Sequence, residues 1–76
     1  MKIEVLGTGC RKCSKAADAI NSIGDELNVD FELEKVTDPS VMMHYQVLST
    51  PAIAINGKLV HSGSVPGSDL IRSWLT

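Results

Sequence analysis

The chain has 76 residues, of which 43% are hydrophobic and 21% charged, and its formal charge is −2. This length allows one domain, spanning residues 1–76. A mildly acidic net charge does not favour binding to the phosphate backbone of nucleic acids. The longest unbroken apolar run, residues 52–55, is far too short to cross a membrane. Because Glu4 interrupts any signal-peptide core, we expect a cytoplasmic protein, and we expect it to be a monomer.

The first half of the chain is predicted to form a strand, a helix and a strand. Residues 2–6 are a short, apolar, β-prone run that a glycine-rich turn follows. From about Cys10 the apolar residues recur every three or four positions, which predicts an amphipathic helix ending within residues 24–28. The apolar side of this helix comprises Cys13, Ala16, Ala17, Ile20, Ile23, Gly24 and Leu27. Apolar and acidic side chains then alternate over residues 29–34, which predicts an outer strand with one wet face.

The second half adds a short helix, a hairpin and a last helix. Asp38-Pro39 is an N-cap and first-turn signal, and a short helix should follow it. Asn56-Gly57 separates apolar runs at 52–55 and 58–61, which predicts a β-hairpin with a type I′ turn. The last helix should begin within residues 66–69. The side chains expected to be buried are Val41, Met42, Tyr45 and Leu48 on the short helix, and Leu70, Ile71, Trp74 and Leu75 on the last one.

The predicted element order is therefore β-α-β-α-β-β-α. A parallel β-α-β unit at the start and an antiparallel hairpin at the end imply an α/β protein with a four-stranded mixed sheet. Helices should cover both faces of this sheet.

The two cysteines, Cys10 and Cys13, are separated by two residues. A disulfide between them would close a very short loop, which the chain-entropy model values at no more than about 2 kcal/mol. The pair is therefore poorly placed as a structural staple. A C-x-x-C pair in a small intracellular chain is typical of redox or metal-binding sites. A chance pair, with a buried cysteine acting as a small hydrophobic residue, is the remaining interpretation.

The expected surroundings of the two sulfurs differ. Cys10 lies at the predicted start of a helix, where unpaired backbone N–H groups and the helix dipole favour the thiolate. Arg11, Lys12 and Lys15 add positive charge, which should lower the pKa of Cys10 further. Cys13 belongs to the apolar side of the helix and should be buried. This asymmetry suits thiol–disulfide exchange, in which one sulfur attacks and the other resolves the mixed disulfide.

Four short motifs occur in order along the chain. They are Gly-Thr-Gly-Cys-x-x-Cys, Ser-Thr-Pro-Ala-Ile, Ile-Asn-Gly-Lys and His-Ser-Gly. With these motifs the chain resembles the thioredoxin superfamily, and most of all its smallest prokaryotic members, the glutaredoxin-like thioredoxins or redox-active disulfide proteins. The resemblance implies a minimal thioredoxin fold, with Cys10 as the attacking thiol and Cys13 as the resolving thiol. It implies a cis Thr50–Pro51 bond beside the disulfide, substrate pairing with the Thr50 backbone, and a third loop that Gly63 lets approach the same groove.

The chain departs from the larger thioredoxins at the cysteines. Arg11-Lys12 stand where those proteins have Gly-Pro, and their buried acid near the resolving thiol has no evident counterpart. Glu4 is the acid of the first strand, and the sequence does not fix its direction. The paired glycines and aspartate of glutaredoxins are replaced by the segment 61–64, so we expect protein disulfides rather than glutathione as substrates.

The leading hypothesis is an enzyme, a thiol–disulfide oxidoreductase that reduces disulfide-containing proteins through Cys10 and Cys13. It would need no further cofactor or metal, and a thioredoxin-reductase-like flavoprotein would recharge it. The alternative is a Cu(I)-type metal chaperone, because heavy-metal-associated domains also place C-x-x-C after a first strand. Those domains usually carry Met where this chain has Thr8, and neither His44 nor His61 lies close in sequence to complete a zinc site. A redox-sensor module is a third possibility that the sequence does not separate from the first.

Overall fold

The computed structural model describes residues 1–7 and 11–76. Within these residues the chain forms four strands and three helices in the predicted order. They are β1 (Lys2–Leu6), α1 (Arg11–Leu27), β2 (Glu32–Val36), α2 (Pro39–His44), β3 (Ala52–Ile55), β4 (Lys58–Ser62) and α3 (Ser68–Leu75). The strands form one sheet in the order β2-β1-β3-β4. β1 runs parallel to β2 and antiparallel to β3, and β3 pairs with β4 as a hairpin, so the sheet is mixed as expected.

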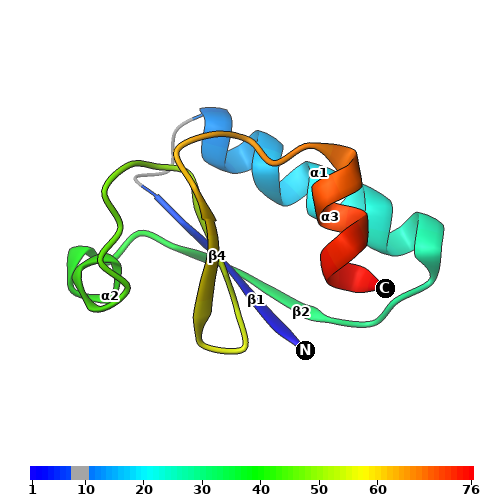
Figure 1. Ribbon diagram of the computed structural model, residues 1–76, viewed down its shortest axis with the longest axis horizontal. Coiled ribbons are helices and arrows are strands. Elements are labelled where there is room, and N and C mark those ends of the chain that lie inside the picture. Colours follow the sequence, from blue (N-terminus) through cyan, green and yellow to red (C-terminus); the bar gives the residue numbers. More distant parts are fainter. Residues whose placement is uncertain (8–10) are drawn as a thin grey trace.

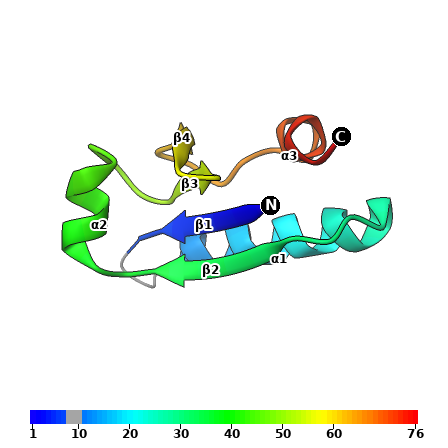
Figure 2. The ribbon, with the colours of Figure 1, turned by 90° about the horizontal axis from the view of Figure 1, so that it is seen from below.

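Helices cover both faces of the sheet. Figure 1 shows α1 and α3 together on one side of the strands and α2 on the other. The alternation of β1 side chains separates two cores: Ile3 and Val5 pack with α1 and α3, whereas Leu6 packs with the residues of α2. Figure 2 shows that β1 and β2 both point toward the end of the molecule where α2 lies. The arrangement is the minimal thioredoxin fold that the resemblance implies.

The strand β2 begins later than predicted. The expected strand covered residues 29–34, but pairing with β1 runs from Glu32 to Val36. Residues 28 and 29 stay tied to the end of α1, because the Asn28 and Val29 amides donate to carbonyls of α1 at 3.2 and 3.0 Å. Asn28 also has a positive φ of 59°. The prediction of an outer strand is confirmed, since β2 lies at the sheet edge with Glu32 and Glu34 exposed.

The short helix α2 begins where the sequence predicted. The Asp38 carboxylate accepts a hydrogen bond from the Ser40 amide at 2.9 Å, which is the expected N-cap. Beyond the helix, Gln46 has a positive φ of 57°, and this reverses the chain. Val47 therefore packs against the core beside α2, and Leu48 is 97% exposed. The prediction that Leu48 is buried was wrong because it continued the helical period past this turn.

The C-terminal elements follow the sequence closely. Asn56 and Gly57 both have positive φ, 51° and 85°, as a type I′ turn requires. On α3, Ile71 and Leu75 are buried and Trp74 packs partly against the same core. Leu70, which was expected to be buried, is 38% exposed. Ile71 and Leu75, four positions apart, define the face of α3 that packs against the core. Leu70 lies about 100° away from Ile71 around the helix.

Candidate functional site

Cys13 lies on the first turn of α1 and points into the protein. It is 4% exposed and belongs to the core cluster between the sheet, α1 and α3, which confirms the predicted burial. Its Sγ lies directly against the backbone of Gly7, because a Cβ added to Gly7 would overlap that sulfur. The chain therefore needs a glycine at this position. Cys10 lies outside the described residues, and so do the predictions that it is accessible and begins the helix.

The entrance to β3 reaches the same glycine. The Cβ position of Gly7 is 3.6 Å from the Thr50 Cβ. The Thr50–Pro51 peptide bond is cis, and Pro51 is fully buried. The end of β1, the first turn of α1 and the start of β3 therefore converge on Gly7, which brings the Thr50 and Cys13 side chains to one place.

The loop after β4 joins this group. The Gly63 amide donates to the Pro51 carbonyl at 2.9 Å, and Gly63 has a positive φ of 92°. A Cβ at Gly63 would lie 2.9 Å from the Ser49 Oγ, so a larger residue would push the loop away from Ser49. The structure thus places Gly63 beside Pro51. Sequence reasoning missed Gly7 and Ser49 as members of this group; their adjacency to the cysteine motif and to Thr50-Pro51 was the available signal.

The cations beside the cysteines face solvent. Arg11, Lys12 and Lys15 are all exposed on the first turns of α1. In the described part of the chain, ion pairs join Lys2 to Glu34 at 3.4 Å and Arg72 to Glu26 at 2.7 Å, and neither pair uses these cations.

Glu4 does not lie on the face of the sheet against which Cys13 packs. Its carboxylate accepts a hydrogen bond from the Tyr45 hydroxyl at 2.8 Å, beside α2. Because side chains alternate along a strand, Glu4 shares the face of Leu6 and not that of Val5. The hydrogen bond to Glu4, burial and the negative charge of Glu4 together raise the pKa of Tyr45 above its usual value. Glu4 therefore holds α2 against the sheet, and it is not placed to accept a proton from Cys13.

The histidines lie apart from Cys13 in their contacts. His61 Nε2 is 3.0 Å from the Ser64 carbonyl oxygen and 3.1 Å from the Ser64 Oγ, and its ring packs near Trp74. His44 is exposed at the end of α2 and contacts the Tyr45 ring. Among residues 1–7 and 11–76, no three His, Cys, Asp or Glu side chains gather in a way that could hold a metal ion.

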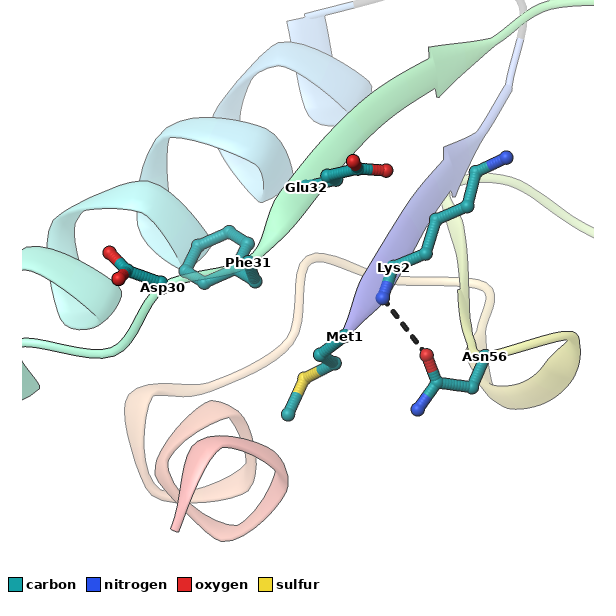
Figure 3. Close-up of a pocket in the computed structure, with 6 residues that line it drawn as sticks. All are labelled: Met1, Lys2, Asp30, Phe31, Glu32 and Asn56. Atoms are coloured by element: carbon teal, nitrogen blue, oxygen red, sulfur yellow. Dashed lines mark hydrogen bonds between the residues drawn. The ribbon is translucent and has the colours of Figure 1, made fainter.

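A surface hollow of about 520 Å³ lies at the opposite end of the sheet (Figure 3). Its walls are Met1, Lys2, Asp30, Phe31, Glu32 and Asn56, and the Lys2 amide donates to Asn56 Oδ1 at 2.9 Å. These residues surround the start of β1 and the end of β3, whereas the group around Gly7 surrounds the end of β1 and the start of β3. A strand of this length separates the two regions by roughly 15 Å. None of the predicted site residues lines this hollow.

The mixed sheet, the buried Cys13 and the loops that meet at Gly7 define a protein of the thioredoxin-like class. Comparison with known proteins specifies the family, because residues 1–76 match the family model for the thioredoxin domain. The chain belongs to this thioredoxin family. It is 33% identical over 73 residues to a thioredoxin of Methanocaldococcus jannaschii, covering 96% of this chain and 84% of that protein. It is 29% identical over 76 residues to a thioredoxin of Methanothermobacter thermautotrophicus, covering 100% and 99%.

Family membership supports a thioredoxin-like redox function and, in general terms, oxidoreductase activity. The helices that the structure describes include none that is long and apolar enough to cross a membrane.

Proposed function

We propose that the protein is a thiol–disulfide oxidoreductase that reduces disulfides in other proteins, with Cys10 and Cys13 as its catalytic pair. The observation that supports this most is the burial of Cys13 against Gly7, with Thr50 in contact range of the same glycine. A resolving thiol must be shielded from bulky substrates and still reach its partner cysteine three positions before it in the chain. Cys13 meets the first requirement by burial, and its spacing from Cys10 in the sequence suits the second.

The reaction transfers two electrons from the cysteine pair to the substrate. The Cys10 thiolate attacks one sulfur of the substrate disulfide, a new S–S bond forms, and the other substrate sulfur leaves as a thiolate. Cys13, after losing its proton, attacks the Cys10 sulfur and releases the second substrate thiolate. The substrate ends as a dithiol once both thiolates take up protons, and Cys10 and Cys13 end as a disulfide. A dithiol or a flavoprotein reductase then returns two electrons to the pair.

The loops around Cys13 give the substrate a place to bind. In this proposal an extended segment of the substrate pairs with the Thr50 backbone, and Gly63 keeps the neighbouring loop close to it. Arg11 and Lys12 lower the pKa of the Cys10 thiol and so raise the fraction of thiolate. The protein works as a monomer in the cytoplasm, uses no cofactor or metal besides the cysteine pair, and is recharged by a thioredoxin-reductase-like flavoprotein.

Trapping the mixed disulfide tests the assigned roles. Cys13→Ser should accumulate a covalent complex between Cys10 and a protein substrate such as insulin, because the resolving sulfur is gone. Cys10→Ser should form no such complex and should not reduce insulin with a dithiol as reductant. Non-reducing electrophoresis and mass spectrometry detect the adduct. A complex that forms through Cys13 in the Cys10→Ser variant would reverse the roles.

The same proteins separate this proposal from metal binding. Wild-type protein should reduce insulin at a rate well above that of the dithiol alone. If it shows no such activity but binds Cu(I) with both thiols in competition with a Cu(I) chelator, the chaperone hypothesis replaces this one. A redox sensor would give a third result, in which the cysteine pair oxidises and reduces but turns over no protein substrate.

A further inference from the structure

Leu48 is the most exposed large apolar side chain in the part of the chain that the structure describes, at 97%. Two other apolar residues of the same segment are packed against the protein. Val47 beside it packs against the core that contains Leu6, and Pro51 is fully buried. The chain therefore turns its smaller apolar residue inward and presents the larger one to solvent.

The exposure of Leu48 comes from a backbone that is fixed on both sides. Before it, the Gln46 and Val47 amides donate to the carbonyls of Met43 and Met42, each at 3.0 Å. After it, Pro51 is buried and its carbonyl accepts from the Gly63 amide. A backbone held in this way loses little further entropy when Leu48 contacts a partner, which favours the use of this residue as a binding contact.

Leu48 stands next to the group around Gly7. It is two residues before Thr50, so their Cα atoms lie no more than about 7 Å apart. Thr50 in turn lies within contact range of the Gly7 position that holds Cys13. A polypeptide that pairs with the Thr50 backbone and continues along the chain toward Leu48 comes within reach of this exposed side chain.

We propose that Leu48 is a specificity-determining contact, which receives an apolar side chain of the protein substrate two or three residues from the reacting cysteine. This inference rests on the proposed function and names its substrate class: disulfides in segments that carry an apolar residue close to the cysteine. Small disulfides that have no such side chain do not use this contact. Met43 is also exposed, at 79%, but it lies on α2 five residues before Leu48 and serves as the matched control.

The test uses two disulfide-linked peptides that are identical except for Leu or Ser two residues from the cysteine. Wild-type protein should favour the Leu peptide in kcat/KM by about three- to tenfold, the range expected when an aliphatic side chain is only partly buried at a surface contact. Leu48→Ser should lose this preference, whereas Met43→Ser should keep it. All three proteins should reduce 2-hydroxyethyl disulfide equally fast, and their midpoints of urea unfolding should agree.

Each other result has a distinct meaning. Wild-type protein that reduces both peptides equally well overturns the proposal. So does a Leu48→Ser variant that still prefers the Leu peptide, or one that loses as much rate on 2-hydroxyethyl disulfide. Sedimentation equilibrium that shows wild-type dimers dissociated by Leu48→Ser assigns the contact to a second copy of the chain instead. A wild-type protein that reduces neither peptide contradicts the proposed function itself.

Discussion

Gly7 controls how closely Cys13 approaches the sheet. The glycine directly follows β1, and its amide donates to the Val36 carbonyl at 2.9 Å, so the backbone here is held in place by β2. The sulfur of Cys13 occupies the space that a Cβ would need. A side chain at position 7 must therefore displace either the paired backbone or the first turn of α1, which carries Cys13.

We expect Gly7→Ser to lower the free energy of unfolding by about 1–3 kcal/mol, the usual cost of overpacking a closely packed site. Urea unfolding measures this loss, and the reaction of Cys13 with a thiol reagent should become faster because its packing is disturbed. Gly67→Ser is the matched control, since nothing lies within 4 Å of its Cβ position and serine is a good N-cap for α3. Equal effects at the two glycines would contradict the packing argument.

The hydrogen bond between Tyr45 and Glu4 fixes α2 to the sheet face opposite Cys13. Tyr45→Phe removes this bond, and we expect the free energy of unfolding at neutral pH to fall by about 0.5–1 kcal/mol, because the pair is only partly buried. The raised pKa of Tyr45 gives the loss a definite pH dependence. A proton held more tightly in the folded state stabilises the fold below the usual tyrosine pKa of about 10.

That stabilisation must disappear as the pH rises from about 10 through the raised pKa that Tyr45 has in the folded protein. The difference in unfolding free energy between wild type and Tyr45→Phe should therefore shrink above about pH 10. Tyr45 is the sole tyrosine of the chain, so the ultraviolet absorbance of tyrosinate reports its titration directly. Glu4→Gln keeps an acceptor but removes the charge, and it should bring the pKa of Tyr45 back toward its usual value. An unchanged titration in Glu4→Gln would show that the hydrogen bond and burial, and not the charge of Glu4, raise the pKa of Tyr45.

At the level of helices and strands, the sequence predicted correctly those turns and helix ends that neighbouring residues determine. Asn56-Gly57 specified its turn through positive φ, and Asp38 specified the start of α2 through its cap. Gln46 gives no comparable signal, since few non-glycine residues adopt positive φ and the sequence does not mark which one will. The burial of Val47 in place of Leu48 follows from that single dihedral angle. The contact of Cys13 with Gly7 joins two elements, and periodicity within one element cannot predict it.

The junction of α1 and β2 depends on a second glycine contact. A Cβ at Gly24 would lie 2.8 Å from Phe31 Cζ and would overlap its neighbour in the ring. Gly24→Ala should gain about 0.8–1 kcal/mol of helix propensity but lose about 1–3 kcal/mol through overpacking, so the net effect is destabilising. In a Phe31→Leu background the overlap is relieved, and the same substitution should then stabilise.

A double-mutant cycle on urea unfolding measures the coupling of the two positions. A change of sign between the two backgrounds supports the packing argument. If Gly24→Ala destabilises equally in both, the ring of Phe31 is not the cause, and the backbone of α1 at this position must be.

Charge is unevenly distributed over the whole molecule. Arg11, Lys12 and Lys15 are exposed on the first turns of α1, and no acid occurs between residues 5 and 17. The hollow of Figure 3, at the far end of the sheet, carries both signs of charge, because Lys2 lines it together with Asp30 and Glu32. The first turns of α1, which carry Cys13, are therefore locally positive although the formal charge of the whole chain is −2. Such a distribution attracts anionic partners toward one end and is screened by salt.

This polarity predicts a salt dependence that differs between substrates. Reduction of an acidic disulfide peptide should slow several-fold as ionic strength rises from about 0.02 to 0.5 M, because the Debye length falls from roughly 20 Å to a few ångströms. A basic peptide should show no such slowing. Lys12→Ser should weaken the salt effect, whereas Lys58→Ser, which removes an exposed cation at the hairpin turn near the hollow, should leave it unchanged.

The neutral 2-hydroxyethyl disulfide separates attraction of the substrate from activation of the thiol. If Lys12 acts by lowering the pKa of Cys10, Lys12→Ser must also slow the neutral disulfide at a pH below that pKa, and the deficit must vanish at higher pH. If Lys12 attracts the substrate, the deficit is confined to the acidic peptide and disappears at high salt. When both roles contribute, pH separates them, because only the attraction of the substrate survives at a pH at which Cys10 is fully ionised. Equal effects of Lys12→Ser and Lys58→Ser on the acidic peptide would mean that net charge alone is felt, and the polarity would then have no part in substrate choice.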